Sequence, residues 1–129
     1  MRSLLTLACL AGLAVPTVAL AANGDLRPGS FQGEWCRYEA IYDLEEQVPG
    51  KWIFHGTITL PRTGQVDRLW VEQHADNSLR IIRYLSGGQV QNVKMAPPVG
   101  ASSTEAAFYS VTSEGPGCAG KRSTMYVPQ

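Results

Sequence analysis

Residues 51–73, KWIFHGTITLPRTGQVDRLWVEQ, hold two short segments rich in aromatic and β-branched side chains, on either side of a glycine-containing turn. In the first segment one face carries Trp52, Phe54, Ile58 and Leu60, and threonines fall on the other. Alternation with a period of two is typical of a half-buried β-strand. The Arg-Thr-Gly sequence at 62–64 favours a tight hairpin, because glycine readily takes the positive φ that such turns require. The stretch therefore predicts two antiparallel strands, 51–60 and 66–73.

The same pattern continues in both directions along the chain. Further short segments rich in β-branched and aromatic residues, separated by turn residues, are 34–42, 78–85, 89–95, 105–112 and 121–127. Beyond the N-terminal region no segment shows a sustained helical repeat. Seven consecutive strands joined mostly by short links predict an all-β antiparallel meander.

The first 21 residues have the features of a cleavable secretory signal peptide. Arg2 supplies a positive n-region, residues 4–15 are uncharged and apolar, and Ala19-Leu20-Ala21 fits the small-x-small cleavage rule. Pro16 interrupts the apolar stretch before it reaches the roughly 20 residues that a membrane-spanning helix needs. We therefore expect an exported protein, periplasmic or secreted, with a signal of the bacterial type.

Cleavage after Ala21 leaves 108 of the 129 residues, a length typical of one domain. We expect a polar leader, 22–33, followed by a single β-domain, 34–129. Without Arg2 the chain has ten Lys and Arg against eleven Asp and Glu, a net charge of −1. Such a chain has no basic field to attract nucleic acid or anionic lipid. We therefore expect no nucleic-acid partner and no membrane span in the mature chain.

Cleavage also removes Cys9 and leaves Cys36 and Cys118. Two cysteines in an oxidising compartment predict one disulfide. A metal pair or a reactive thiol is the alternative, but neither cysteine has the nearby His or Cys that a zinc site needs. On the chain-entropy model, a bridge between positions this far apart stabilises the fold by about 4.5 kcal/mol.

The disulfide also carries information about topology. It would bring the first predicted strand close to the last, because bonded cysteines have Cα atoms within about 7 Å of each other. We therefore predict that the meander closes into a small barrel of seven or eight strands without free edges, with a two-layer β-sandwich as the alternative.

Gly33-Glu34-Trp35 opens the first predicted strand. This Gly-x-Trp segment resembles the signature with which lipocalins and related calycin barrels begin their first strand. The resemblance implies that Trp35 plugs one end of the barrel and that a basic residue near the last strand, Arg122 or Lys121, stacks across it. A cation over an indole contributes about 0.5–2 kcal/mol, so Trp35 and Arg122 are assigned structural roles.

No arrangement of residues in the sequence is typical of a catalytic site. The two histidines, His55 and His74, would have to converge with a carboxylate such as Glu72 or Asp76 to bind a metal or to transfer protons. A solvated hairpin end is the simpler interpretation, and no Gly-x-Ser-x-Gly elbow is present. We therefore expect no enzyme activity, no metal and no cofactor.

Two features favour binding. The aromatic supply is generous, and part of it could line an apolar pocket rather than only fill the core; the candidate ligand-binding residues are Tyr38, Trp52, Phe54, Trp70, Tyr84 and Phe108. The Gly- and Pro-rich loop 113–120 could either present Glu114 and Pro116 to a partner or serve as a plain connector.

The leading hypothesis is an exported β-barrel that holds a small apolar ligand or presents its loops to an envelope protein. The alternative is a periplasmic inhibitor or immunity protein that blocks a cell-wall hydrolase or a toxin.

Overall fold

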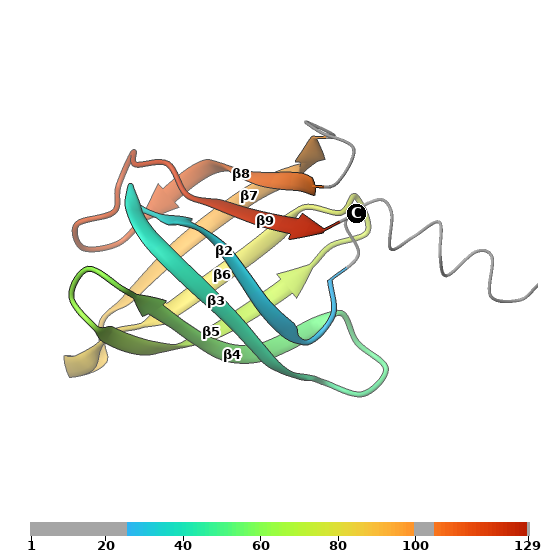
Figure 1. Cartoon of the computed structure of the whole chain (residues 1–129), viewed down its shortest axis with the longest axis horizontal. Coiled ribbons are helices and arrows are strands. Elements are labelled where there is room, and N and C mark those ends of the chain that lie inside the picture. The colour runs from blue at the N-terminus through green and yellow to red at the C-terminus, as the bar shows by residue number, and fades with distance from the viewer. Residues whose placement is uncertain (1–25, 100–104, 129) are drawn as a thin grey trace, which may run out of the picture.

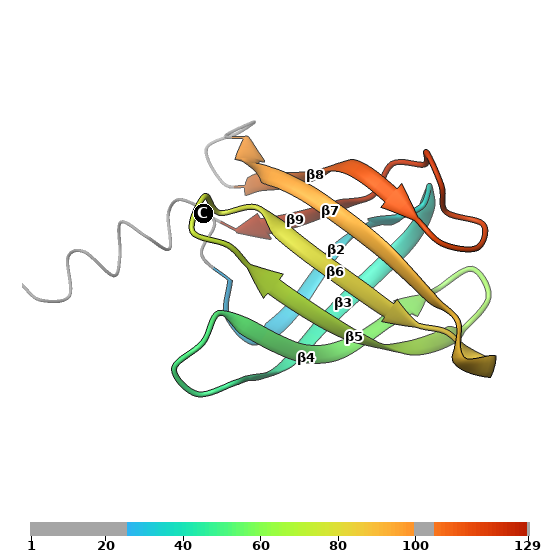
Figure 2. The ribbon, with the colours of Figure 1, turned by 180° about the vertical axis from the view of Figure 1, so that it is seen from behind.

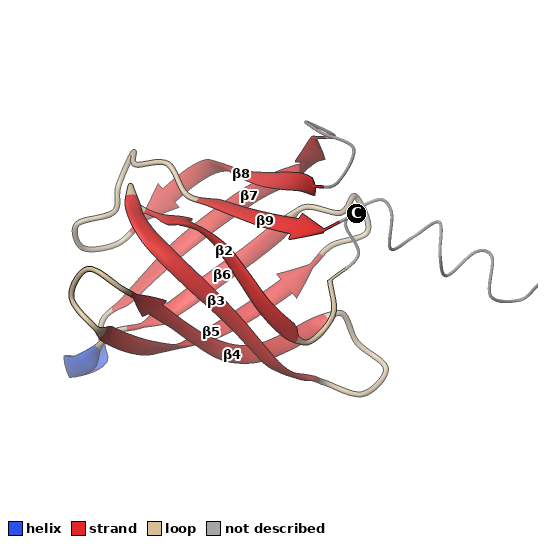
Figure 3. Cartoon of the chain, in the orientation of Figure 1, coloured by secondary structure: helices blue, strands red, loops and turns tan. Residues whose placement is uncertain are grey.

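The computed structural model describes residues 26–99 and 105–128, and over these residues the chain forms eight strands (Figure 1). Each strand pairs antiparallel with the next, and the last returns to the first, so the sheet is a closed barrel. The strands are β2 Gly29–Trp35, β3 Tyr38–Gln47, β4 Ile53–Leu60, β5 Gln65–Gln73, β6 Leu79–Tyr84, β7 Val90–Val99, β8 Glu105–Glu114 and β9 Thr124–Pro128. A short 3₁₀ turn, η1 Ser86–Gly88, lies between β6 and β7 (Figure 3). The predicted antiparallel meander barrel is confirmed.

The barrel closes where β2 meets β9. Gly33 pairs with Met125 and Glu34 pairs with Thr124. The two backbones come so close that a Cβ atom on Gly33 would lie 1.9 Å from the carbonyl oxygen of Thr124. Only glycine fits there. Seen from behind, β4 to β8 form the continuous wall opposite this seam (Figure 2).

The segment 34–42 contains a turn, so the prediction of one strand there is wrong. β2 ends at Trp35, and Cys36 and Arg37 form a two-residue turn with φ values of 50° and 74°. Positive φ at both central residues is typical of the tight hairpin turns that match strand twist. Cys36 therefore lies in a turn and not in a strand, and the segment contributes to two of the eight described strands.

The barrel begins earlier than the sequence suggests. β2 starts at Gly29, so the barrel takes in part of the predicted leader 22–33. Leu26 is buried, and its N–H donates to Gln73 Oε1 at 3.3 Å. The predicted signal, 1–21, lies outside the described residues. Within the described residues, no helix is long and apolar enough to cross a bilayer.

The interior of the barrel is filled by side chains. The largest of those that are fully buried are Trp35, Tyr42, Phe54, Phe108, Leu26, Ile58, Leu79, Ile81, Met95, Met125, Val71 and Val93. The Tyr42 hydroxyl donates to the carbonyl oxygen of Glu34. Burial, and then the charge of Glu34, raise the pKa of Tyr42 well above its usual value, so the hydroxyl remains a donor.

The predicted disulfide between Cys36 and Cys118 is confirmed. Its Cα atoms are 5.2 Å apart, within the usual range for a disulfide. Cys118 lies in the loop 115–123 between β8 and β9. The bridge therefore joins the turn after β2 to the loop before β9, beside the seam that closes the barrel.

Candidate functional site

The structure does not bring the six candidate aromatic residues together in one pocket. Phe54 and Phe108 are fully buried in the core. Trp70 faces outward from β5 and pairs across the strands with His55. Its Nε1 donates to Glu72 Oε2 at 2.7 Å, which places it on the outer wall of the barrel.

The remaining three candidates are exposed at different places. Trp52 lies just before β4 and is 46% exposed. Tyr84, at the end of β6, is 41% exposed, and Tyr38, at the start of β3, is 44% exposed. Of these three, Tyr38 lines the cleft described next.

One end of the barrel carries both the disulfide and a cleft. We call it the disulfide end; its connections are 36–37, 61–64, 85–89 and 115–123, gathered at the left of Figure 1. The cleft has a volume of about 420 Å³, within the range of small-molecule sites. The residues that line its walls and floor include Trp35, Tyr38, Leu60, Arg62, Arg83, Leu85, Gln91 and Lys121. We call it the disulfide-end cleft.

The floor of the cleft is a buried hydrogen-bonded network. Arg83 donates from Nε and Nη2 to Asp67 Oδ2, at 2.8 and 2.6 Å. Gln91 Oε1 accepts from Arg83 Nη1 at 3.1 Å and from Trp35 Nε1 at 2.6 Å. Gln91 Nε2 donates in turn to the carbonyl of Pro116. Because Arg83 and Gln91 are 5% and 7% exposed, the network is a rigid part of the barrel end.

Arg83 and Asp67 form a buried ion pair; their side chains are 6% and 10% exposed. A buried charge is tolerated only when it is paired and hydrogen-bonded. The two N–H···O bonds to one carboxylate oxygen meet that requirement. The pair therefore links β5 to β6 under the cleft.

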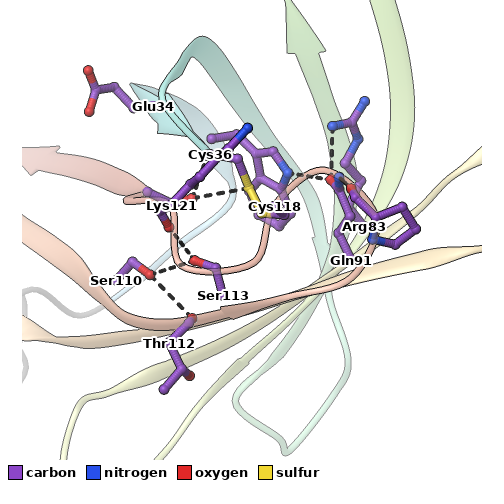
Figure 4. Close-up of a disulfide and its surroundings, with 12 residues drawn as sticks. Glu34, Cys36, Arg83, Gln91, Ser110, Thr112, Ser113, Cys118 and Lys121 are labelled. Carbon is purple, nitrogen blue, oxygen red and sulfur yellow. Dashed lines mark hydrogen bonds between the residues drawn. A yellow bond between two sulfur atoms is a disulfide. The ribbon is translucent and has the colours of Figure 1, made fainter.

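The loop 115–123 is held against the barrel end at several points (Figure 4). Besides the disulfide, Ser113 Oγ donates to the carbonyl of Lys121. Ser123 Oγ accepts from the N–H of Cys36 at 2.8 Å, and the Arg37 N–H donates to the carbonyl of Arg122 at 2.9 Å. These bonds hold the loop beside the turn at 36–37.

Glu114 and Pro116, the predicted partner residues, are both exposed. Pro116 belongs to the loop 115–123, and its carbonyl is bonded to Gln91. Glu114 is the last residue of β8 and lines a separate wall cavity of about 340 Å³ with Arg80 and Lys94. The two residues therefore belong to different elements, β8 and the loop after it.

The histidines lie on the outer wall and toward the opposite end. The His55 ring centroid lies 5.2 Å from that of Trp70, and His55 Nδ1 is 3.5 Å from Glu46 Oε1. His74 Nε2 lies 3.9 Å from Glu72 Oε1. Within the part of the chain that the structure describes, no group of three or more His, Cys, Asp or Glu residues could hold a metal ion.

Sequence reasoning missed Arg83, Asp67 and Gln91. A signal was available for Arg83, because it follows Leu79 and Ile81 in the inward-facing register of β6. A cation at an inward position needs a buried partner. The partner could not be named from sequence, since Asp67 and Gln91 come from neighbouring strands.

Trp35 is 1% exposed and lies under the disulfide-end cleft, as a plug would. Arg122 is turned away: its side chain is 65% exposed, and its Nη2 lies 3.4 Å from Glu34 Oε1. Arg83, and not Arg122, is the cation bonded to Gln91 Oε1, the oxygen that also accepts from the Trp35 indole.

A scan against models of known protein families, a search of curated proteins and a search of solved structures each found no match. The lipocalin resemblance stays a prediction that rests on Gly33-Glu34-Trp35.

Proposed function

We propose that this chain is an exported, non-enzymatic binding protein that uses the disulfide-end cleft as its binding site. The observation that carries the proposal is the cleft of about 420 Å³ above a buried, hydrogen-bonded floor. Ligand sites of small barrels lie preferentially at their mouths. A floor that is rigid before binding lowers the ordering cost of association.

The packing of the core favours the cleft over the barrel interior as the place for a small apolar ligand. Tyr42, Phe54 and Phe108 occupy the middle of the barrel and are 0% exposed. A ligand there would have to displace close-packed side chains, which costs several kcal/mol in a typical core. A ligand in the cleft displaces only solvent.

Export to the periplasm or the exterior of a bacterial cell is the second part of the proposal. The disulfide supports it, because such bonds persist in oxidising compartments. Expression of the full chain, followed by mass spectrometry of the recovered protein, tests it. We expect a chain that begins at Ala22 with Cys36 and Cys118 oxidised. A chain that retains residues 1–21 and has free thiols would overturn this part.

The binding site can be mapped by NMR with two related probes, N-phenyl-1-naphthylamine and its sulfonate, 8-anilinonaphthalene-1-sulfonate. We expect at least one of them to shift the Trp35 indole N–H and the amides of Tyr38, Leu85 and Lys121. The amide of Asp76, at the opposite end, should not move. Shifts confined to the opposite end, or no binding of either probe, would contradict the proposed site.

A second candidate function is inhibition of a cell-wall hydrolase or a toxin. It is favoured by the loop 115–123, which is fixed at Cys118 and at Pro116, so it would lose little entropy on entering a partner's cleft. In assays with purified cell-wall hydrolases, the chain should then inhibit hydrolysis, and Glu114→Ala or Pro116→Ala should reduce that inhibition. Val111→Ala, at an exposed position of β8, is the matched control. Equal inhibition by all variants would exclude Glu114 and the loop 115–123 as the inhibiting surface.

A further inference from the structure

The charged side chains that line the disulfide-end cleft all have the same sign. They are Arg62, Arg83 and Lys121, and among the described residues that line the cleft none is Asp or Glu. A hollow lined by one sign of charge with low-dielectric walls focuses the field and concentrates counter-ions. The cleft therefore attracts anions although the whole chain is neutral.

Asp67 neutralises Arg83 from below, so the net positive charge of the cleft comes from Arg62 and Lys121. Over residues 26–99 and 105–128, no carboxylate lies within ion-pair distance of either residue. Arg83 contributes in another way. Its three bonds use three of the five guanidinium N–H donors, which leaves one each on Nη1 and Nη2 without a described partner.

Much of the rest of the cleft is apolar, and polar side chains such as Gln65 also line it. Tyr38, Leu60 and Leu85 form its walls, and Trp35 lies in its floor. Tyr38 is 44% exposed, so its ring has surface available to a ligand. A ligand that fills the cleft therefore needs an apolar body as well as a charge.

Resting on the proposed binding function, we infer that the disulfide-end cleft binds a small free molecule with one anionic group on an aromatic or branched apolar body. Arg62 and Lys121 contact the anionic group, and guanidinium and ammonium donors form their strongest bonds with such acceptors. The apolar body packs against Tyr38, Leu60 and Leu85. A membrane surface fits less well, since recognition of anionic lipid typically takes about 4–8 clustered basic residues.

The two naphthylamine probes test the ligand class, because they share one apolar body and differ only in the sulfonate. Fluorescence titration of the full mature chain should show that the sulfonate binds at least about tenfold more tightly than the neutral probe, as expected for a charge-assisted hydrogen bond. Raising the salt concentration should weaken binding of the sulfonate and leave binding of the neutral probe nearly unchanged.

The double variant Arg62→Gln with Lys121→Gln identifies the cations. It should lower the affinity for the sulfonate about tenfold, to that of the neutral probe, while the affinity for the neutral probe stays the same. Arg80→Gln with Lys94→Gln, on the outer wall, removes the same charge and is the matched control. Near-ultraviolet circular dichroism confirms that each variant is folded.

The outcomes separate the inference from the function on which it rests. If both probes bind in the cleft with equal affinity, the binding function stands and the anionic class is wrong. If neither binds, the binding site itself is wrong. If the control lowers the affinity as much as the cleft variant, the effect is general charge and the inference is overturned. Flotation with phosphatidylglycerol vesicles that the sulfonate competes away would overturn the choice of a free molecule.

Discussion

The two ends of the barrel are held together by different kinds of contact. At the disulfide end the contacts span long stretches of sequence: the disulfide joins residues 82 positions apart, and Trp35 bonds to Gln91, 56 positions away. At the opposite end the connections 48–52 and 74–78 are held mainly by local bonds. The N–H of Val48 donates to the carbonyl of Ile53 at 2.8 Å, for example. Binding sites need rigid walls, and at the disulfide end a buried side-chain network links residues of β2, β5, β6 and β7.

The largest effect is expected when the disulfide at one end is removed, with Cys36→Ser and Cys118→Ser together. We expect the free energy of unfolding to fall by about 4 kcal/mol, because the unfolded chain regains the entropy of a long closed loop. Urea unfolding measures the loss. Hydrogen exchange should show lost protection in 115–123 and unchanged protection in 74–78. Equal loss at both ends would mean that the ends are not held independently.

Arg83→Met tests the buried pair in the floor of the cleft. It leaves Asp67 buried without its partner, and we expect a loss of about 3 kcal/mol in urea unfolding. Arg80→Met is the control, since the exposed pair of Arg80 with Glu72 at 3.4 Å should contribute less than about 1 kcal/mol. Replacing Asp67 by Leu as well should restore part of the loss, and no restoration would contradict the unpaired-charge explanation.

Substitution of one tryptophan at each end compares directly how much the two ends contribute to stability. Trp35→Phe removes a buried N–H···O bond and some ring volume, so we expect a loss of about 2 kcal/mol. Trp52→Phe, at the opposite end where the ring is 46% exposed, should change stability by less than about 0.5 kcal/mol. Thermal unfolding of both variants gives the comparison, and similar melting temperatures would refute it.

The smallest expected effect on stability is the pH-dependent contribution of Asp76, in the turn 74–78. Its Oδ1 accepts from Ser78 Oγ at 2.6 Å and from the Ser78 N–H at 2.9 Å, and these bonds lower the pKa of the Asp76 carboxyl below its usual value. A lowered folded-state pKa means that the stabilisation is present above the unfolded pKa and is lost as pH falls below about 4. NMR titration should show the low pKa, and Ser78→Ala should raise it. An unchanged pKa would show that the Ser78 hydroxyl is not its cause.

The hairpins show which strands and turns can be predicted from local sequence. Residues 51–73 predict β4 and β5 well, because both the alternation and the turn at 62–64 are local signals. The turn at Cys36-Arg37 was missed, since neither residue favours positive φ. Ser123 and Arg122 hold that turn through hydrogen bonds, and they lie at the far end of the chain.

The aromatic side chains divide by their register in the strands. Phe54 and Phe108 take inward positions and are buried, whereas Trp70 takes an outward one. Trp52 shares the parity of Phe54, but β4 begins after it, so the alternation does not apply. The predicted strand begins at 51, two residues before β4 does, and this difference places Trp52 at the surface and not in the core.

The sequence by itself determined the β-strand pattern and the antiparallel meander, and through Cys36 and Cys118 it favoured a closed barrel over a two-layer sandwich. These follow from local alternation and from covalent geometry. Only the tertiary structure decided that Arg83, Asp67, Gln91 and Trp35 meet under a cleft. Those residues lie on four different strands, and their meeting depends on the pairing register around the whole barrel, which no local signal encodes.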